Sequence, residues 1–242
     1  MNICFEDVDA FYARSQILHG VSLAVPGGKL TAILGRNGVG KTTLLKTLMG
    51  LLDRMTGSIR LGSETTGSGR AGMREMGGEP TYRRARAGIA YVPQGRQIIP
   101  DFTVRENILM GAFARMDGKR VIPEMAAELF PYLMDNLDRL GGVLSGGQQQ
   151  QLAIARALAA DPKVLLLDEP SEGIQPSVVE DIERIIMRLN QEAGMTVLLV
   201  EQNVAFVRRA GHRFAMMEKG RVVAGGAIDA LTDDLVHRHM AV

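Results

Sequence analysis

The chain has 242 residues, 46% of them hydrophobic, and a formal net charge of +1 at pH 7. This length can bury a full α/β core without disulfides, and it fits one large domain or a domain with an inserted subdomain. The acids and bases are interspersed and nearly balanced, which argues against DNA or RNA as the primary partner.

The cysteine content and the apolar runs indicate the cellular compartment in which the protein is expected. Cys4 is the single cysteine, so an internal disulfide is excluded and a reducing compartment is favoured. Residues 1–11 have no basic region followed by an apolar run, so we expect no secretory signal and a cytoplasmic location. The longest apolar runs, residues 164–167 and 197–200, suit buried strands and are far too short for a membrane span.

The first 34 residues predict short strands separated by turns. The strand candidates are residues 3–8, 21–25 and 30–34. A polar corner at residues 13–16 and a Pro-Gly-Gly turn at residues 26–28 separate them. Tyr12 lies in this region, where its ring either stacks on an adenine or packs within the protein, and the residues alone favour packing.

A glycine-rich segment follows the third of these strands and matches the pattern Gly-x-x-x-x-Gly-Lys-[Ser/Thr]. Its residues are Gly35, Arg36, Asn37, Gly38, Val39, Gly40, Lys41, Thr42 and Thr43. Strand, loop and helical spacing are in register, which favours a nucleotide-phosphate cradle over an ordinary glycine-rich turn. The glycines let backbone N–H groups converge on phosphate oxygens, and the helix N-terminus adds a positive end. Lys41 is predicted to reach the β- and γ-phosphates, and Thr42 to ligate Mg²⁺.

A long stretch without a hydrophobic period separates the next two strand candidates, residues 58–61 and 90–92. It covers residues 62–80, is rich in Gly, Ser, Thr and Met, and is predicted to be a mobile surface loop. The second strand leads to Gln94. A glutamine just beyond a strand can offer its amide oxygen to Mg²⁺ or to an attacking water, although such a residue is more often a plain surface glutamine.

The following region is predicted to be helical. A capping box at Thr103 to Glu106 starts one helix, and a second helix is expected to begin near Pro123. A small-residue turn then opens another helix, and its residues are Leu144, Ser145, Gly146, Gly147 and Gln148. The hydroxyl and backbone N–H groups of this turn form a second potential anion site.

Two carboxylates, Asp168 and Glu169, end the apolar run of residues 164–167. Such a continuous run predicts a parallel strand buried on both faces, and α/β proteins bind ligands at the carboxyl edge of those strands. With a phosphate loop upstream, two merely solvated loop acids are disfavoured. Asp168 is predicted to hold the Mg²⁺ shell through water, and Glu169 to orient and polarise the attacking water.

The remainder predicts a covering helix, one more buried strand and a hairpin. A capping box at Ser177 is expected to start the helix, and residues 196–200 form the strand. Asn203 is a predicted N-cap of the next helix. Residues 214–217 and 222–224 predict a hairpin, and a polar helix closes the chain.

Taken in order, the phosphate loop, Gln94, residues 144–148 and the Asp168-Glu169 pair resemble the ATP-binding subunits of ABC transporters. The resemblance covers essentially the whole chain, and Leu-Ser-Gly-Gly-Gln before a helix is its most specific part. It implies an α/β fold with a phosphate-loop, RecA-like parallel core, an antiparallel β subdomain and an inserted helical subdomain. Residues 1–242 would form this single domain, with the helical subdomain at approximately residues 98–160.

The resemblance also implies roles. Tyr12 would stack on adenine, Gln94 would sense Mg²⁺ and the membrane partner, and Glu169 would be the catalytic carboxylate. Two such domains would enclose two ATP molecules. Each ATP would lie between the phosphate loop of one domain and residues 144–148 of the other domain, and closure of the two domains would drive the membrane subunits. The implied cofactors are ATP and Mg²⁺. The implied partners are a second ATPase subunit, permease subunits and, indirectly, a periplasmic binding protein, with the chain peripheral on the cytoplasmic face of the inner membrane.

Short segments around these motifs are similar to those of the ABC ATPases in the branched-chain amino acid and urea uptake group. They lie in residues 34–41, 91–96, 168–176 and 200–203. Residues 172–175 and 148–151 favour urea or a related small polar solute, with branched-chain amino acid import as the alternative.

Three features depart from the usual family pattern. Gln202 stands where a histidine usually contacts the γ-phosphate, and because glutamine carries no charge, transition-state stabilisation is expected to be weaker. Gln175 stands where many relatives have an aspartate, and the loop of residues 62–80 is longer than expected. These departures predict a heterodimer with a second, non-identical ATPase subunit, with a homodimer as the alternative.

The sequence disfavours two other classes of protein. A soluble ABC ATPase acting on DNA or ribosomes usually has two ATPase halves or a long coiled-coil insertion, neither of which this sequence shows. A small-molecule kinase would have no use for residues 144–148.

Overall fold

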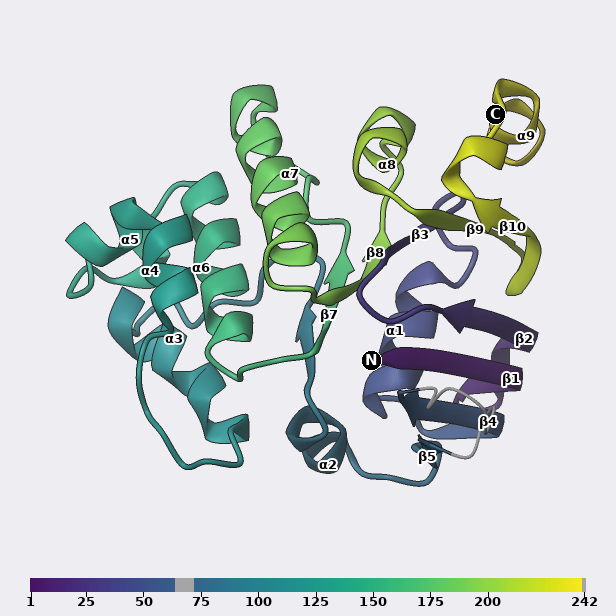
Figure 1. Cartoon of the computed structure of the whole chain (residues 1–242), viewed down its shortest axis with the longest axis horizontal. Helices are drawn as coiled ribbons and strands as arrows, with labels where there is room; N and C mark the ends of the chain where they lie inside the picture. Colours follow the sequence, from purple (N-terminus) through teal and green to yellow (C-terminus); the bar gives the residue numbers. More distant parts are fainter. Residues whose placement is uncertain (64–71, 241–242) are drawn as a thin grey trace.

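The computed structural model describes residues 1–63 and 72–240, which form two β-sheets with helices around them (Figure 1). One sheet has the strand order β2-β1-β4-β5 and is antiparallel. Its strands are β1 (Asn2–Tyr12), β2 (Ser15–Val25), β4 (Arg54–Gly62) and β5 (Met73–Glu75). The other sheet has the order β10-β9-β3-β8-β7-β6. Its strands are β3 (Leu30–Leu34), β6 (Ile89–Val92), β7 (Val164–Asp168), β8 (Thr196–Val200), β9 (Arg213–Glu218) and β10 (Arg221–Ala227).

The second sheet is parallel except at one edge. Strands β9, β3, β8, β7 and β6 run parallel, and β10 returns antiparallel to β9 as the predicted hairpin. All five residues of β3, β7 and β8 are buried, as expected for central parallel strands covered on both faces. This explains why their sequences are continuous apolar runs.

Helices cover both faces of the parallel sheet. The α-helices of the described residues are α1 (Lys41–Met49), α2 (Thr81–Arg86), α3 (Val104–Gly111), α4 (Glu124–Leu129), α5 (Pro131–Asp135), α6 (Gly146–Leu158), α7 (Pro176–Gln191), α8 (Val204–Ala210) and α9 (Asp233–Met240). Helix α1 contacts strands of both sheets, while α7 and α8 lie across the opposite face of the parallel sheet (Figure 1). Helices α3 to α6 gather at the end of the molecule far from the antiparallel sheet (Figure 1).

The core has two parts, one on each face of the parallel sheet. Alternate residues of each strand point to opposite faces, so Leu166 and Leu198 pack with α1 and the antiparallel sheet. Leu165 and Leu199 pack with α6, α7 and α8. Within the described part of the chain, no helix has the length and hydrophobicity that a bilayer crossing requires.

The sequence predictions are confirmed for most elements, including the capping box at Thr103 and the N-cap at Asn203. The predicted start of α7 was wrong. The helix begins at Pro176, with Gln175 as the N-cap and no side-chain cap bond, so Ser177 lies inside the first turn. Proline is favoured at the first helical position because its φ suits the helix and it has no N–H to satisfy there.

The single helix expected from Pro123 was also wrong, because two short helices, α4 and α5, occupy this stretch. They meet at Phe130, which has φ −128° and ψ 60° and precedes Pro131. A proline disfavours helical backbone in the residue before it, which ends the first helix.

The predicted loop of residues 62–80 contains a strand. Strand β5 pairs antiparallel with β4, and Met76 just beyond it is fully buried. A three-residue strand is too short to show a hydrophobic period, so its pairing could not be read from sequence. Residues 64–71 of this prediction lie outside the described residues.

Candidate active site

The carboxyl ends of β3, β7 and β8 meet at one edge of the parallel sheet, where the phosphate-loop candidate begins. Gly35 follows β3 and has φ +149°, and a Cβ atom there would lie 2.4 Å from the Met217 carbonyl oxygen. Gly40 is the N-cap of α1 with φ +105° and makes no side-chain cap bond. Only glycine tolerates both the left-handed backbone and the close approach, so the loop can expose its N–H groups at the start of α1.

Lys41 lies at the centre of this loop. Its side chain is 4% exposed, and Nζ donates to the carbonyl oxygens of Gly35 at 2.9 Å and Arg36 at 3.0 Å. A third contact is the Glu169 carboxylate, with Oε1 at 3.3 Å. A buried ammonium is costly unless it is paired, and these contacts supply the pairing.

Asp168 is 1% exposed at the end of β7, and two hydroxyls hold its carboxylate. Thr42 Oγ1 donates to Oδ1 at 2.9 Å, and Tyr91 Oη donates to Oδ2 at 2.9 Å. Burial raises the pKa of Asp168, and the two hydrogen bonds partly offset that rise. Both donors are neutral, and of the nearby charged groups Glu169 raises the pKa of Asp168 further while Lys46 lowers it.

These residues fit Mg²⁺. Carboxylate and hydroxyl oxygens are ligands that Mg²⁺ prefers, and a cation beside Asp168 would compensate its charge. Among the described residues, no three His, Cys, Asp or Glu side chains gather into a metal site. Thr42 and Asp168 would therefore hold Mg²⁺ together with water and substrate oxygens, which is the usual pattern for this ion.

Glu169 has a strained backbone, with φ +47°, which is unusual for a residue with a Cβ. Its N–H donates to the Val200 carbonyl at 2.9 Å, so β8 fixes this conformation. The side chain is 9% exposed, contacts Lys41 through Oε1 and accepts from Gln202 Nε2 through Oε2 at 2.9 Å. Glu169 is thus held at the point where the phosphate loop and the end of β8 converge.

Gln202 joins the phosphate loop to this carboxylate, because Nε2 also donates to Asn37 Oδ1 at 2.7 Å. The backbone of Gln202 is fixed by Glu201, which is 2% exposed. Glu201 accepts from the N–H groups of Gln202 and Asn203 and from the Ser171 hydroxyl. Sequence reasoning missed Glu201, although an acid directly after a buried strand is the same signal that identified Asp168.

A hollow of about 360 Å³ opens in front of these groups. Its lining residues are Tyr12, Ile17, Asn37, Gly38, Gly40, Lys41, Thr42, Thr43, Gln94 and Glu169. All of them except Ile17 were predicted from sequence. Tyr12 ends β1 and is 38% exposed, so its ring is available to a ligand. The volume lies in the range of small-molecule sites.

Gln94 and residues 144–148 are the remaining predicted site segments. Gln94 lines the hollow, but its amide nitrogen donates to Glu172 Oε2 at 2.8 Å. Residues 144–148 do not line the hollow. Ser145 is exposed and caps α6 by accepting from the Gln148 N–H, and the Gln148 side chain accepts from the Ser145 N–H.

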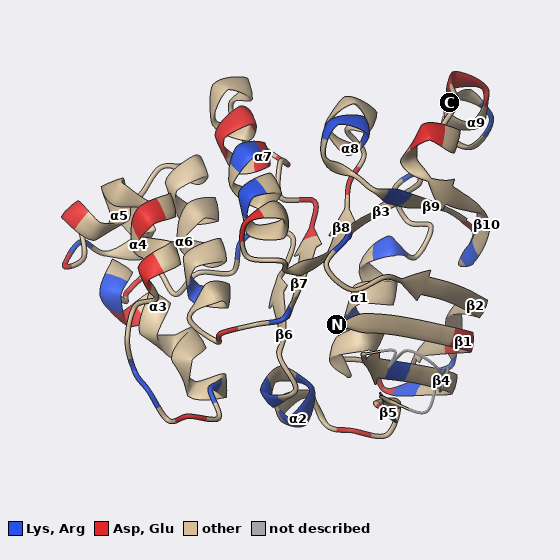
Figure 2. Ribbon diagram, in the orientation of Figure 1, with Lys and Arg blue, Asp and Glu red and all other residues tan. Residues whose placement is uncertain are grey.

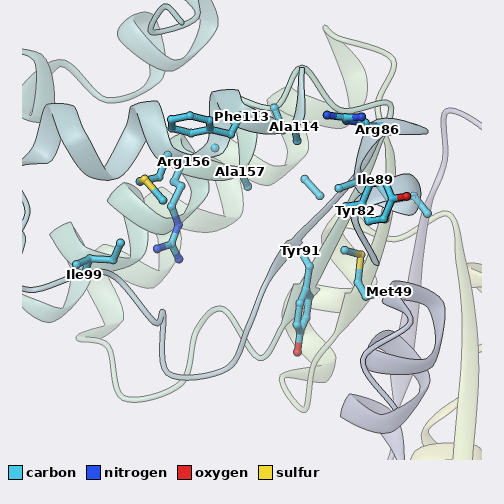
Figure 3. A pocket seen from close by; sticks show the side chains of 15 residues that line it. Met49, Tyr82, Arg86, Ile89, Tyr91, Ile99, Phe113, Ala114, Arg156 and Ala157 are labelled. Atoms are coloured by element: carbon cyan, nitrogen blue, oxygen red, sulfur yellow. The ribbon is translucent and has the colours of Figure 1, made fainter. Parts of the chain in front are cut away.

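A second cavity of about 560 Å³, here called the groove, lies between β6 and α2 on one side and α3 and α6 on the other (Figure 3). Its lining is mostly apolar and includes Met49, Tyr82, Met110 and Phe113. Helix α2 is strongly basic (Figure 2), and its Arg86 lines the groove.

The sequence and the fold match known proteins. A family model described as "ABC transporter" matches residues 18–172. A high-affinity branched-chain amino acid transport ATP-binding protein, BraG of Pseudomonas aeruginosa, is 41% identical over 222 residues, which is 91% of each chain. A Nod factor export ATP-binding protein I of Paraburkholderia xenovorans is 36% identical and covers 94% of this chain and 71% of its own length.

Solved structures agree with these relatives. A nucleotide-free ATP-binding cassette from an ABC transporter has a TM-score of 0.76 at 25% identity, covering 100% of this chain and 96% of that one. A dimeric cassette in a post-hydrolysis state, bound to ADP and Pi, has the same TM-score and identity and covers 93% of this chain and 98% of that one.

Proposed function

The chain belongs to the ABC transporter family of ATP-binding proteins, and we propose that it is the ATP-hydrolysing motor of an importer for a small solute. ATP hydrolysis coupled to transport, with ATP and Mg²⁺, follows from family membership. The observation that carries the proposal is the convergence of Lys41, Thr42 and Glu169 on one hollow, with Asp168 directly behind Thr42.

The site residues divide the reaction between them. Lys41 and the N–H groups of the phosphate loop bind the phosphates, and Tyr12 stacks on the adenine. Glu169 orients the attacking water and accepts its proton, as a positioned general base does. The Gln202 amide donates to Glu169 and so fixes that carboxylate toward the substrate. Bound Mg²⁺ supplies compensation for phosphate charge, and Thr42 and Asp168 hold it, the latter through water.

Dimerisation completes the site. Ser145 is exposed at the start of α6, and residues 144–148 lie outside the hollow, which supports a role toward the nucleotide of a second subunit. The dimeric cassette among the similar structures supports the same arrangement. Gln202 and Gln175 support a heterodimer whose two sites hydrolyse unequally. Light scattering on Glu169→Gln with ATP tests this, since a stable homodimer without another chain would contradict it.

The groove is where we place the permease contact. It is mostly apolar and includes residues of β6, the strand that leads to Gln94, so an inserted helix would contact the strand that positions the residue proposed to sense the membrane partner. With this contact, we propose that the chain lies at the cytoplasmic face of the membrane, held by its partners.

The solute is a separate proposal. The names of BraG and of LivF from Archaeoglobus fulgidus, which is 34% identical, support branched-chain amino acids. Residues 172–175 and 148–151 support urea, and none of the relatives named above carries urea in its name. Export stays a competing outcome, because the Nod factor protein has a comparable identity to the chain.

The proposal is tested by measuring uptake of labelled leucine and labelled urea. The cells used carry Glu169→Gln in their only copy of this protein. We expect ATP binding to be kept and hydrolysis to fall by about 10²–10⁴, as for loss of a general base. Uptake of one solute should fail, and that solute identifies the importer. Glu180→Gln, on the exposed side of α7, is the matched control. Unchanged hydrolysis in Glu169→Gln would refute the assignment of the base.

A further inference from the structure

Tyr91 takes part in two sites at once. It is a residue of β6, and its side chain lines the groove. Figure 3 shows its ring beside Met49, with the hydroxyl pointing away from Phe113 and Arg86 at the other end of the groove. That hydroxyl donates to Asp168 Oδ2 at 2.9 Å, and Asp168 is one of the two residues placed at the metal site.

The pairing of β6 with β7 explains how one side chain reaches both places. Tyr91 lies opposite Leu166 in the parallel ladder, and Asp168 is two residues further along β7. Residues two apart in a strand share a face, and side chains lean along the strand, so the phenol extends past Leu166 to the carboxylate. The chain positions that supply this contact are 77 residues apart.

The contact fixes the orientation of the carboxylate. Thr42 donates to Oδ1 and Tyr91 donates to Oδ2, so the two hydroxyls hold the two oxygens from different elements, α1 and β6. A carboxylate retains further lone pairs after accepting one bond at each oxygen, and these would be available to a metal or to its water ligands. Without the phenol, the Asp168 side chain could rotate away from Thr42.

We propose that Tyr91 is a positioning residue that orients Asp168 for Mg²⁺ and connects it to the groove. The inference rests on the proposed ATP and Mg²⁺ site. A helix entering the groove would press on the same ring whose hydroxyl holds Asp168, so occupation of the groove would change the Mg²⁺ requirement.

Tyr91→Phe tests the first part, because it keeps the ring and removes the hydroxyl. The readout is the Mg²⁺ concentration that gives half of the extra thermal stabilisation seen with a non-hydrolysable ATP analogue. We expect this concentration to rise about tenfold, the low end of what loss of a metal-orienting residue costs. Affinity for the analogue in EDTA should stay unchanged. Tyr82→Phe, which removes a hydroxyl from the same groove, is the control.

The outcomes separate the two levels of proposal. If the wild-type chain shows no stabilisation by the analogue or by Mg²⁺, the proposed function fails. If the wild-type chain responds and Tyr91→Phe has the same Mg²⁺ midpoint, only the positioning role is refuted.

A double-mutant cycle tests the connection to the groove. Met110 lines the groove and is 42% exposed, and Met110→Trp fills part of the groove in the isolated chain. We expect this substitution to shift the Mg²⁺ midpoint by about threefold when Tyr91 is present and not in Tyr91→Phe, since coupled sites are non-additive. Equal shifts in both backgrounds, or no shift in either, would overturn the connection.

Discussion

Replacing Arg84 by methionine tests whether one buried cation holds the phosphate-loop helix in place. The Arg84 side chain is in α2 and is 2% exposed. Nη1 donates to the carbonyl oxygens of Thr47 and Leu48 near the end of α1, both at 2.8 Å. Nε donates to the Glu79 carbonyl at 2.7 Å, and Nη2 to the Gly77 carbonyl at 2.8 Å. The cation thus lies at the negative end of the α1 dipole, where it is favourable.

The expected loss follows from these four bonds. Each hydrogen bond from a charged donor contributes about 1.5–3 kcal/mol net, while burying the guanidinium costs several kcal/mol. Burial accordingly lowers the pKa of Arg84. Replacement by methionine removes the hydrogen bonds together with the cost of burying the guanidinium, and it leaves four carbonyls without this donor. We therefore expect the unfolding free energy to fall by about 3–5 kcal/mol. For a chain of this size, that is a fall in Tm of about 6–20 °C.

Calorimetry and urea unfolding measure this loss. Arg86→Met is the matched control, because Arg86 is on the same helix but exposed, and its Tm should change by less than about 2 °C. A loss below about 1 kcal/mol in Arg84→Met would refute the reasoning, since it would mean that water satisfies the carbonyls as well as the guanidinium does.

Three further predictions concern the site and its support. Gln202→Ala removes both amide hydrogen bonds, so phosphate release should slow by about 10²–10³ with little change in ATP affinity, and unchanged turnover would contradict its role. Lys41→Met should abolish ATP binding as well as hydrolysis, because its charge acts on ground-state phosphates, so retained ATP affinity would count against it. Burial lowers the pKa of His212, whose Nδ1 accepts from Leu30 N–H at 3.2 Å. Its stabilisation is therefore present above the ordinary imidazole pKa of about 6.5 and is lost as pH falls toward the folded value. Unfolding free energy should fall from pH 7 to 5, and a profile in His212→Asn as steep as the wild type would exclude this histidine as the cause.

The fold was predictable from sequence where burial or capping leaves a local pattern. Strands β3 and β8 were predicted with their observed bounds and β7 to within one residue, because a strand covered on both faces is a continuous apolar run. Strands β1 and β4 are longer than predicted, since their outer residues pair in the sheet without an apolar signal. Strand β5 depends wholly on its partner and left no signal of its own.

The site, like the fold, was predictable from sequence only in part. Its motifs are local, so the phosphate loop and the two carboxylates at the end of β7 could be named from their spacing. The contacts that orient them are not local: Gln202 and Asn37 are 165 residues apart, and Arg84 and Thr47 are 37 apart. Tyr91 and Arg84 have no chemistry that a sequence pattern identifies. Their roles follow only from which strand pairs with which and how α2 packs on α1.

The pairing inside the site explains how such a chain can act as a motor. Lys41 is neutralised by Glu169 and Asp168 is held by two hydroxyls, so these charged groups already have partners within the protein. Those partners come from α1, from β6 and from the residue that follows β7. A phosphate that takes Lys41, or a cation that takes Asp168, exchanges these internal contacts for its own, and packed elements respond by shifting between discrete arrangements. Ligand binding and movement of these elements therefore alter the same contacts of Lys41 and Asp168. Because Tyr91 also lines the groove, it connects these contacts to the groove.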